Sequence, residues 1–258
     1  WFGAKKFDSY LIDRIMEFQR THDLEVDGYV GEVTHRRVMT NREAFPNSDK
    51  RILCNGVLIP IKWDKVRIDL LKEGCYKKVT KARSPTMVVT HWDVCLSSMS
   101  CAKVLAKRNV SVQFCIDNDG TIIQLHDMNE VCWHAGNSKV NHASVGVEIS
   151  NAFYTKYQSW YKKNGFGERP IKSGALAQDK VIEDFTWFYP VQIEALKALY
   201  KAIHEGCDVP LESPGEKWAY DKSAASGKFK GFMNHFHCRT SKIDCAGLDI
   251  EALLKEIK

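Results

Sequence analysis

Histidine, acidic and thiol side chains are concentrated at two places far apart in the sequence. His91 follows the apolar run that begins at Met87, and a second group runs from His235 to Cys245 and includes Asp244. Imidazole, carboxylate and thiolate are the protein ligands of zinc, which binds them at about 2.0–2.3 Å. An isolated histidine beside apolar residues is also a common core residue. The residue types therefore raise the hypothesis of a zinc site and leave a purely structural interpretation open.

Glu148 is the one acidic residue in the apolar segment 145–149. Alternation along a strand places Glu148 and Gly146 on the face opposite to the valines. A glutamate in such a position is ordinarily exposed to solvent. Beside a metal it can instead act as a general base, and a lysine such as Lys242 can stabilise an oxyanion that develops on the substrate.

The elements that must position these residues alternate between short strands and helices from residue 52 onward. The predicted strands cover 86–91, 111–116, 121–125, 145–149 and 229–237, and the predicted helices cover 99–108, 191–204 and 249–257. This order predicts an α/β fold with a mixed central β-sheet flanked by helices.

Local signals refine this prediction at four places. Asp119-Gly120 predicts a hairpin turn, and Gly206 is expected to end the helix 191–204. In the strand 229–237, alternation would place His235 and His237 on one face. Residues 154–185 lack a clear period and predict a long loop.

The N-terminal part of the chain predicts a separate, small all-helical domain. Apolar residues recur at helical spacing from Tyr10 to Phe18, and Asp27-Gly28 then marks a tight turn. Polar residues with a proline follow and indicate a linker. The predicted organisation is a helical domain at 1–42, a linker at 43–54 and the α/β domain at 55–258.

Composition excludes several classes of protein. The 258 residues are 44% hydrophobic and 27% charged, which is typical of a folded globular chain. The longest apolar runs are far short of the roughly 18 residues of a membrane span. A net charge of +5, with no basic helix or aromatic sheet motif, argues against nucleic-acid binding. Nine cysteines without a Cys-x-x-Cys argue against a zinc ribbon and against complete disulfide pairing. No signal-peptide pattern is visible near Trp1, which leaves export undecided.

Several segments of the predicted α/β domain resemble the zinc-dependent N-acetylmuramoyl-L-alanine amidases, in the superfamily that includes the peptidoglycan-recognition proteins. The similar segments are 88–91, 110–114 with 119–122, 133–138, 144–149, and His235 with 242–244. Residues 8–38 resemble a small three-helix peptidoglycan-binding domain through Phe18-Gln19, Leu24, Val26-Asp27-Gly28, Val30-Gly31 and Thr34.

The resemblance assigns roles to individual residues. It implies zinc ligands at His91, His235 and Asp244, a catalytic carboxylate at Glu148, a catalytic lysine at Lys242, and substrate contacts at Trp133, His134 and Asn137. The family also uses the spacing between His237 and Cys245 for its second and third ligands, so this pair competes with His235 and Asp244. Cys95 and Cys101 have the spacing of a disulfide found in peptidoglycan-recognition proteins, but we expect them to be two small buried residues.

The resemblance also implies a function. It predicts a Zn²⁺-dependent peptidoglycan hydrolase that cleaves the amide between N-acetylmuramic acid and L-alanine, with the N-terminal domain holding the bacterial cell wall. We expect a monomer that is either a phage endolysin, made in the cytoplasm and acting on the wall, or a secreted autolysin. The alternatives are a non-catalytic peptidoglycan-recognition protein and a virion-associated structural lysin.

Overall fold

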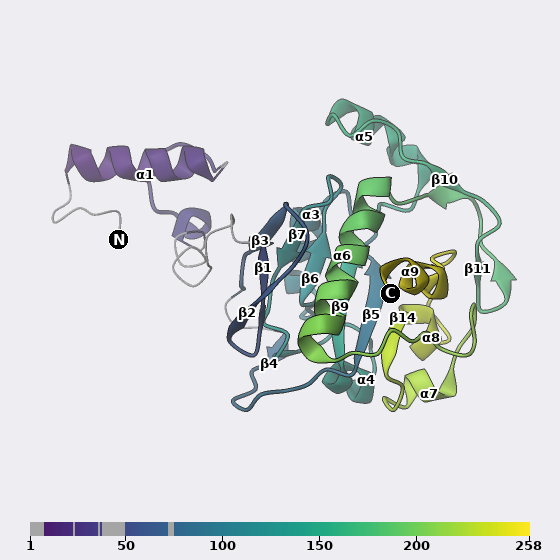
Figure 1. The fold of residues 1–258 in the computed structure, drawn as a ribbon. Coiled ribbons are helices and arrows are strands. Elements are labelled where there is room, and N and C mark those ends of the chain that lie inside the picture. Colours follow the sequence, from purple (N-terminus) through teal and green to yellow (C-terminus); the bar gives the residue numbers. More distant parts are fainter. Residues whose placement is uncertain (1–7, 23, 36, 38–49, 72–74) are drawn as a thin grey trace. The chain divides into compact units, whose positions relative to one another are not determined.

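The computed structural model describes residues 8–22, 24–35, 37, 50–71 and 75–258 (Figure 1). The chain divides into two compact units, Trp1–Pro46 and Asn47–Lys258. The predicted linker 43–54 contains strand β1 (Arg51–Cys54), so the larger unit begins earlier than predicted. Part of the predicted helical domain and most of the predicted linker lie outside the described residues. Among those that are described, no helix combines the length and hydropathy that a membrane crossing requires.

The smaller unit is organised around one buried glutamine. Helix α1 (Ser9–Thr21) presents Gln19, whose side chain is fully buried. Its Nε2 donates hydrogen bonds to Asp27 Oδ1 at 2.7 Å and to Thr34 Oγ1 at 3.1 Å, and its Oε1 accepts one from Gly28 N at 3.0 Å. Gln19 therefore fixes the predicted Asp27-Gly28 turn against α1, and a second helical segment at 32–35 follows.

A six-stranded mixed sheet forms the centre of the larger unit, in the order β14-β5-β9-β6-β7-β3. Its strands are β3 (Val66–Ile68), β5 (Met87–Trp92), β6 (Phe114–Ile116), β7 (Ile122–Gln124), β9 (Ser144–Ile149) and β14 (Gly231–Asn234). Strands β14, β5, β9 and β6 run parallel, and β7 returns antiparallel to β6. The predicted hairpin turn is confirmed, with Gly120 at a φ of +80°. The predicted mixed α/β fold is confirmed.

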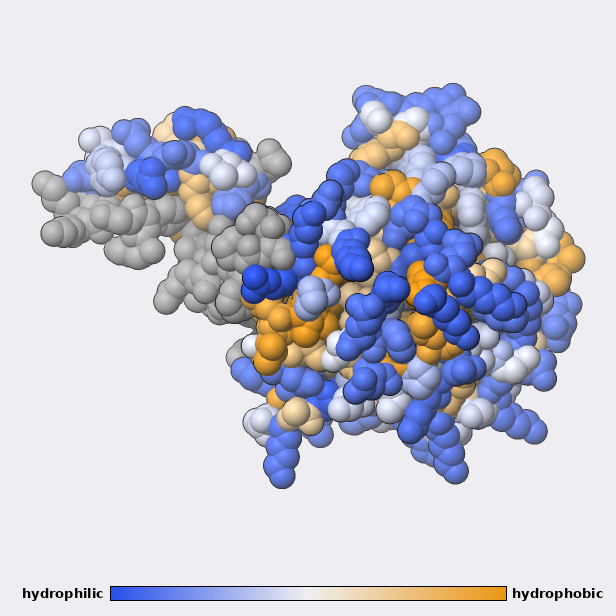
Figure 2. Space-filling model, in the orientation of Figure 1, coloured by the Kyte–Doolittle hydropathy of each residue, from blue (hydrophilic) through white to orange (hydrophobic). Residues whose placement is uncertain are grey.

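Helices cover both faces of the sheet and leave its apolar side chains buried. The main helices are α3 (Ser98–Lys107), α4 (Ser138–Ala143), α6 (Pro190–Cys207), α7 (Lys222–Ala225) and α9 (Ile250–Ile257). One core cluster joins Val88 and Val147 to α6 and α9, and α6 crosses that face in Figure 1. On the opposite face, Val89 packs with α4 and α7, and Cys115 packs with α3. The outer surface drawn in Figure 2 is mostly hydrophilic, with scattered apolar patches.

Helix α6 is longer than predicted, because Gly206 does not end it. The helix continues to Cys207, and Asp208 closes it with a left-handed φ of +56°. A Cβ atom on Gly206 would lie 2.2 Å from Ile59 Cδ1. The glycine therefore permits close packing of α6 against strand β2 (Val57–Pro60), which pairs with β1.

The predicted long loop 154–185 contains short helices and strands of its own, so the prediction of a loop over the whole segment is wrong. They are η2 (Thr155–Tyr157), α5 (Gln158–Lys163) and the pairs β10 (Ile171–Lys172) with β13 (Phe185–Thr186) and β11 (Leu176–Ala177) with β12 (Lys180–Val181). Strands of two residues carry too little periodicity to be predicted. Elsewhere, β4 (Tyr76–Lys77) pairs with β8 (Val131–Cys132).

One buried arginine joins this segment to the core. Arg169 is 2% exposed, and its guanidinium carbon lies 4.4 Å from the ring centres of both Tyr161 and Tyr189. Its guanidinium donates hydrogen bonds to the backbone oxygens of Trp187 and Ser150 and to the side chains of Gln192 and Asn118.

We expect Arg169→Met to lower the free energy of unfolding by about 3 kcal/mol, because it leaves several buried acceptors without a donor. Chemical denaturation measures this change. Lys156→Met is a matched control, since Lys156 also lies over two tyrosine rings but is exposed to solvent. The control should lose no more than about 1 kcal/mol. Equal losses of unfolding free energy in the two variants would show that the buried hydrogen bonds of Arg169 do not stabilise the fold.

Candidate metal centre and active site

The candidate site lies where parallel strands end. His91 on β5 is the register partner of Glu148 on β9, so the two side chains share one face of the sheet. Strand β14, which is parallel to β5, ends at Asn234, and His235 follows at once. Because the carboxyl ends of parallel strands meet at one edge, residues remote in sequence converge there.

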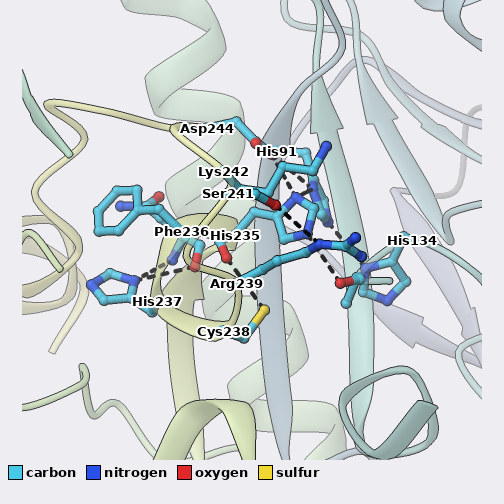
Figure 3. A network of polar contacts seen from close by, with 12 residues as sticks. His91, His134, His235, Phe236, His237, Cys238, Arg239, Ser241, Lys242 and Asp244 are labelled. Carbon is cyan, nitrogen blue, oxygen red and sulfur yellow. Dashed lines mark hydrogen bonds and ion pairs between the residues drawn. The ribbon is translucent and has the colours of Figure 1, made fainter. Parts of the chain in front are cut away.

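The predicted strand 229–237 is wrong at its C-terminal end. Strand β14 stops at Asn234, and α8 (His235–Cys238) begins, so His235 and His237 do not share a strand face. Instead, His237 Nδ1 accepts a hydrogen bond from Asn234 N at 3.0 Å, and its Nε2 lies 3.2 Å from Lys217 O. Burial lowers the pKa of His237 to about 4. His237 thus closes the first turn of α8 and points away from the candidate site, as Figure 3 shows.

Three ligand-type atoms converge in the site. His91 Nδ1 lies 3.0 Å from His235 Nδ1 and 3.0 Å from Asp244 Oδ2, and His235 Nδ1 lies 2.9 Å from the same oxygen (Figure 3). All three residues are buried. Within the part of the chain that the structure describes, this is the one group of three such residues close enough to share a metal ion.

The three atoms are spaced like three of the four ligands of a cation with tetrahedral coordination. Ligands at about 2.0 Å from zinc stand about 3.3 Å apart, close to the separations found here. His235 Nε2 lies 3.1 Å from Ala135 O, and a carbonyl oxygen only accepts, so the lone pair of His235 is on Nδ1 and faces the site. A buried group of acceptors facing one another is costly without a cation between them.

The protonation states of the other two candidate ligands also suit a metal. Burial and the neighbouring His235 lower the pKa of His91 to about 4, so His91 is neutral near pH 7. Burial alone would raise the pKa of Asp244, but positive charge and donated hydrogen bonds at the facing nitrogens of His235 and His91 outweigh burial and lower the pKa well below its ordinary value. A cation between the three atoms would supply the same positive charge. Neutral imidazole and ionised carboxylate are the forms that bind zinc.

The competing pair of His237 and Cys245 is not brought together. The nitrogens of His237 bond to the backbone of Asn234 and Lys217, as described above, while Cys245 lies in the core cluster that includes α6 and α9. Cys101, on α3, is buried as expected, whereas Cys95 is only half-buried; both are free thiols and pack in one cluster with Cys115.

Glu148 is buried, so its interpretation as a solvent-facing carboxylate is wrong. Its Oε2 has no hydrogen-bond partner. Burial, reinforced by the charges of Asp93 and Asp244, raises the pKa of Glu148 well above its ordinary value, and the charge of Lys242 opposes this. A buried carboxylate with an unused oxygen beside candidate metal ligands is suited to exchange protons with a substrate or water.

The other predicted residues include Lys242, His134 and Trp133, which differ in their contacts with this centre. Lys242 is half-buried and lies close enough for its charge to act on His91 and Glu148. His134 Nδ1 lies 3.0 Å from His91 Nε2, which places His134 directly against a candidate ligand. Trp133 is half-buried, with its ring centre 6.4 Å from that of His142.

Asn137 has a structural task in addition to any contact with substrate. Its Oδ1 accepts hydrogen bonds from Lys139 N and Val140 N at the start of α4, and its Nδ2 donates one to Ala225 O at 2.8 Å. The side chain is thus largely occupied by capping. Its contact with substrate remains a prediction, as do those of Trp133 and His134.

Sequence reasoning missed one cationic residue at the rim of the site. Arg239, just after α8, donates a hydrogen bond from Nη1 to Gly136 O at 3.0 Å and is itself exposed. A Cβ atom on Gly136, whose φ is +59°, would lie 1.7 Å from Arg239 Nη1. A glycine at position 136 could have indicated that another group approaches the backbone closely there, but only the fold shows that this group is Arg239.

Together, the fold and the site define a class of α/β protein with a buried His-His-Asp centre beside a glutamate. Residues 81–225 match the N-acetylmuramoyl-L-alanine amidase family Amidase_2, which is more than half of the chain. The chain belongs to this family. The matched range contains His91, His134 and Glu148 and ends before His235 and Asp244, which only the structure brings to them.

Solved structures with a similar fold include several amidases. A selenomethionine derivative of AmpD has 16% identity and a TM-score of 0.44, with 78% of this chain and 99% of that chain covered. The catalytic domain of XlyA has 17% identity and a TM-score of 0.46, covering 75% and 99%. The Staphylococcus aureus hydrolase AmiA, in complex with its ligand, has 10% identity and a TM-score of 0.47, covering 75% and 81%. No curated protein matched this chain in sequence.

Proposed function

We propose that this protein hydrolyses the amide bond between N-acetylmuramic acid and the first L-alanine of the stem peptide, with zinc held by His91, His235 and Asp244. Membership in the amidase family supports peptidoglycan amidase activity in general. The observation that carries the finer proposal is the buried convergence of these three ligand atoms beside a glutamate oxygen that has no partner.

The residues divide the chemistry between them. Zinc, when bound, acts as a Lewis acid and brings the pKa of water down toward about 7. Glu148 takes a proton from the water that attacks the lactyl carbonyl and passes it to the amide nitrogen as the C–N bond breaks. A carboxyl group whose pKa is raised by burial can serve as both base and acid near neutral pH. The charge of Lys242 stabilises the oxyanion.

Mass spectrometry of digested peptidoglycan tests the bond and the class together. The expected products are glycan chains with free lactyl groups and intact stem peptides that begin with L-alanine. New reducing ends would indicate a glycosidase, and cuts within the peptide would indicate an endopeptidase. Tight binding without any product would indicate a non-catalytic recognition protein.

The smaller unit is proposed to bind the bacterial cell wall, as in an endolysin or an autolysin. That residues 1–46 form a compact unit of their own supports a tethering role, since a tether raises the effective concentration of an enzyme at an insoluble substrate. We propose that the protein is a monomer that reaches the wall either as a phage lysin or after secretion.

Deleting residues 1–45 is expected to weaken binding to intact walls by about tenfold or more while sparing cleavage of soluble muropeptides. Co-sedimentation with purified walls measures binding, and kcat/KM on a soluble muropeptide measures catalysis. Gln19→Leu without the deletion is the companion variant, because it removes the hydrogen bonds that hold the Asp27-Gly28 turn to α1. Equal loss of binding and of soluble-substrate turnover would contradict a role confined to targeting.

A further inference from the structure

A chain of hydrogen bonds leads from the candidate metal centre to the backbone. His91 Nε2, on the side of the ring away from Asp244, lies 3.0 Å from His134 Nδ1. His134 Nε2 lies 3.1 Å from Ser144 Oγ, and Ser144 Oγ donates a hydrogen bond to Val140 O at 2.7 Å. The rings of His91 and His134 meet edge to face, with their planes at 85°. Both side chains are labelled in Figure 3.

The carbonyl oxygen of Val140, the last acceptor in this series of hydrogen bonds, determines which atom is the donor in each of them. Val140 O can only accept, so the single proton of the Ser144 hydroxyl is used there. Ser144 Oγ must then accept from His134 Nε2–H, which leaves the lone pair of His134 on Nδ1. That lone pair accepts from His91 Nε2–H. The lone pair of His91 is therefore on Nδ1, the atom that faces His235 and Asp244.

We propose that His134 is a positioning residue which, with Ser144, holds His91 in the Nε2–H tautomer that a metal ion requires. This inference rests on the proposed zinc site and gives His134 a role other than the substrate contact expected from the sequence. If donor and acceptor were exchanged in these hydrogen bonds, His91 would carry its proton on Nδ1, and that proton would block the metal position. Partners of this kind orient metal-binding histidines and increase their basicity.

The absence of a side chain at Gly146 leaves room for the His134 ring. A Cβ atom at this position would lie 2.8 Å from both Cγ and Cδ2 of His134, so the ring lies against the bare backbone of β9. Gly146 is two residues before Glu148 on the same face of the strand. Strand β9 therefore supports both the proposed base and the residue that orients the first ligand.

The test compares two buried serines. Ser144→Ala removes the group that accepts from His134. Ser111→Ala removes a hydroxyl that also donates to a backbone carbonyl, that of Cys75, but has no hydrogen bond with a histidine. Ser144→Ala is expected to weaken zinc binding by about tenfold, measured by competition with a chelator, and Ser111→Ala is expected to leave zinc affinity unchanged. His134→Phe keeps a ring without nitrogens and should weaken zinc binding at least as much.

The tautomers themselves are read by nitrogen NMR of the metal-free protein. The wild type should show His91 protonated on Nε2, and Ser144→Ala should show a mixture of the two tautomers. Protonation on Nδ1 in the wild type, or equal zinc affinities for the two serine variants, would overturn the inference. Normal zinc affinity and the expected tautomer without cleavage of the muramoyl amide would instead refute the proposed function and leave the role of His134 standing.

A second, independent observation concerns two cysteines that are not part of this centre. Cys54 Sγ on β1 lies 3.1 Å from Cys207 Sγ at the end of α6, although the two residues are 153 positions apart. Cys54 is buried and Cys207 is half-buried, so an oxidant can reach the pair through Cys207. Cys207 is the donor in their hydrogen bond, which lowers the pKa of Cys54 and, together with burial, raises that of Cys207.

We infer that these two thiols form a reversible disulfide that joins the first strand of the larger unit to α6. The oxidant is a small disulfide such as oxidised glutathione. Cys207 passes its proton to Cys54 across their hydrogen bond, and the Cys207 thiolate attacks one sulfur of the oxidised glutathione and releases one glutathione thiolate. Cys54 then gives up this proton, and its thiolate attacks Cys207 Sγ and releases the second. Two electrons pass to glutathione, and the two protein thiols lose two protons.

Intact-mass analysis and peptide mapping after treatment with oxidised glutathione test this pairing. The wild type and the Cys75→Ser control should each lose two hydrogens, yield a Cys54–Cys207 peptide and gain about 5 °C or more in Tm, and dithiothreitol should reverse the change. Cys54→Ala should show neither the cross-link nor the gain in Tm. Glutathione adducts alone, a link between other cysteines, or the same Tm gain in Cys54→Ala would overturn the inference.

Discussion

Replacing Glu148 with glutamine is expected to reduce muramoyl amide cleavage at least about 100-fold while leaving zinc bound. Glutamine keeps the size and shape of the side chain but cannot take a proton from water. Turnover of a soluble muropeptide and the metal content of the purified variant measure the two properties. Retained turnover would show that the base is another residue, and loss of zinc would show that Glu148 supports the metal centre.

The same substitution is expected to raise the stability of the metal-free protein. Burial raises the pKa of Glu148 well above its value of about 4.3 in an unfolded chain. Between these two pKa values the folded state binds more protons than the unfolded state, so stability falls as pH rises through this window. Glutamine does not titrate. The gain in Tm should therefore be larger near pH 7 than near pH 4, as thermal unfolding at both pH values will show.

Glu130 offers a matched control for both measurements. Its Oε2 lies 3.1 Å from His126 Nδ1, so its carboxylate has a partner, unlike that of Glu148. Glu130→Gln should keep its activity and gain no stability. If both glutamine variants became more stable, the gain could not be attributed to the unpartnered carboxylate in the site.

Removing the metal is the second change with a large expected effect. Treatment with a chelator should lower amide cleavage at least about 1,000-fold, and added zinc should restore it, because the reaction loses its Lewis acid. Zinc at 100 times its Kd should also stabilise the folded state by about 2.7 kcal/mol. Calorimetry with and without zinc measures this. Full activity in chelator, with no metal found by elemental analysis, would refute the zinc mechanism.

Asp244→Asn tests the same centre through one ligand. Loss of the charged oxygen near His91 and His235 should weaken zinc binding at least about 100-fold. Asp127→Asn is the control, since Asp127 accepts hydrogen bonds from the backbone of Asn55, Gly56 and Asn129 away from the site. The control should lower Tm without changing zinc affinity. Equal zinc affinities for the two variants would exclude Asp244 as a ligand.

Local periodicity was enough to predict the parts of the fold that depend on neighbours in the sequence. The strands that became β5 and β9 and the amphipathic helix α9 have patterns that repeat over several residues, so their positions could be predicted. The same reasoning failed where the chain turns abruptly. Alternation alone could not show that β14 ends at Asn234, because Met233, His235 and His237 also fit a strand.

The residues of the candidate site could be selected from the sequence, but their proximity could not be predicted from it. Residue types and family resemblance selected His91, His235, Asp244 and Glu148 from the sequence, since these side chains can bind zinc or move protons. Whether they meet depends on the pairing of β14 and β9 with the two sides of β5, which brings together residues 144 positions apart. Burial of Glu148 and the contact of His134 with Ser144 likewise arise only once the sheet has formed, because a one-dimensional pattern contains no information about which faces meet.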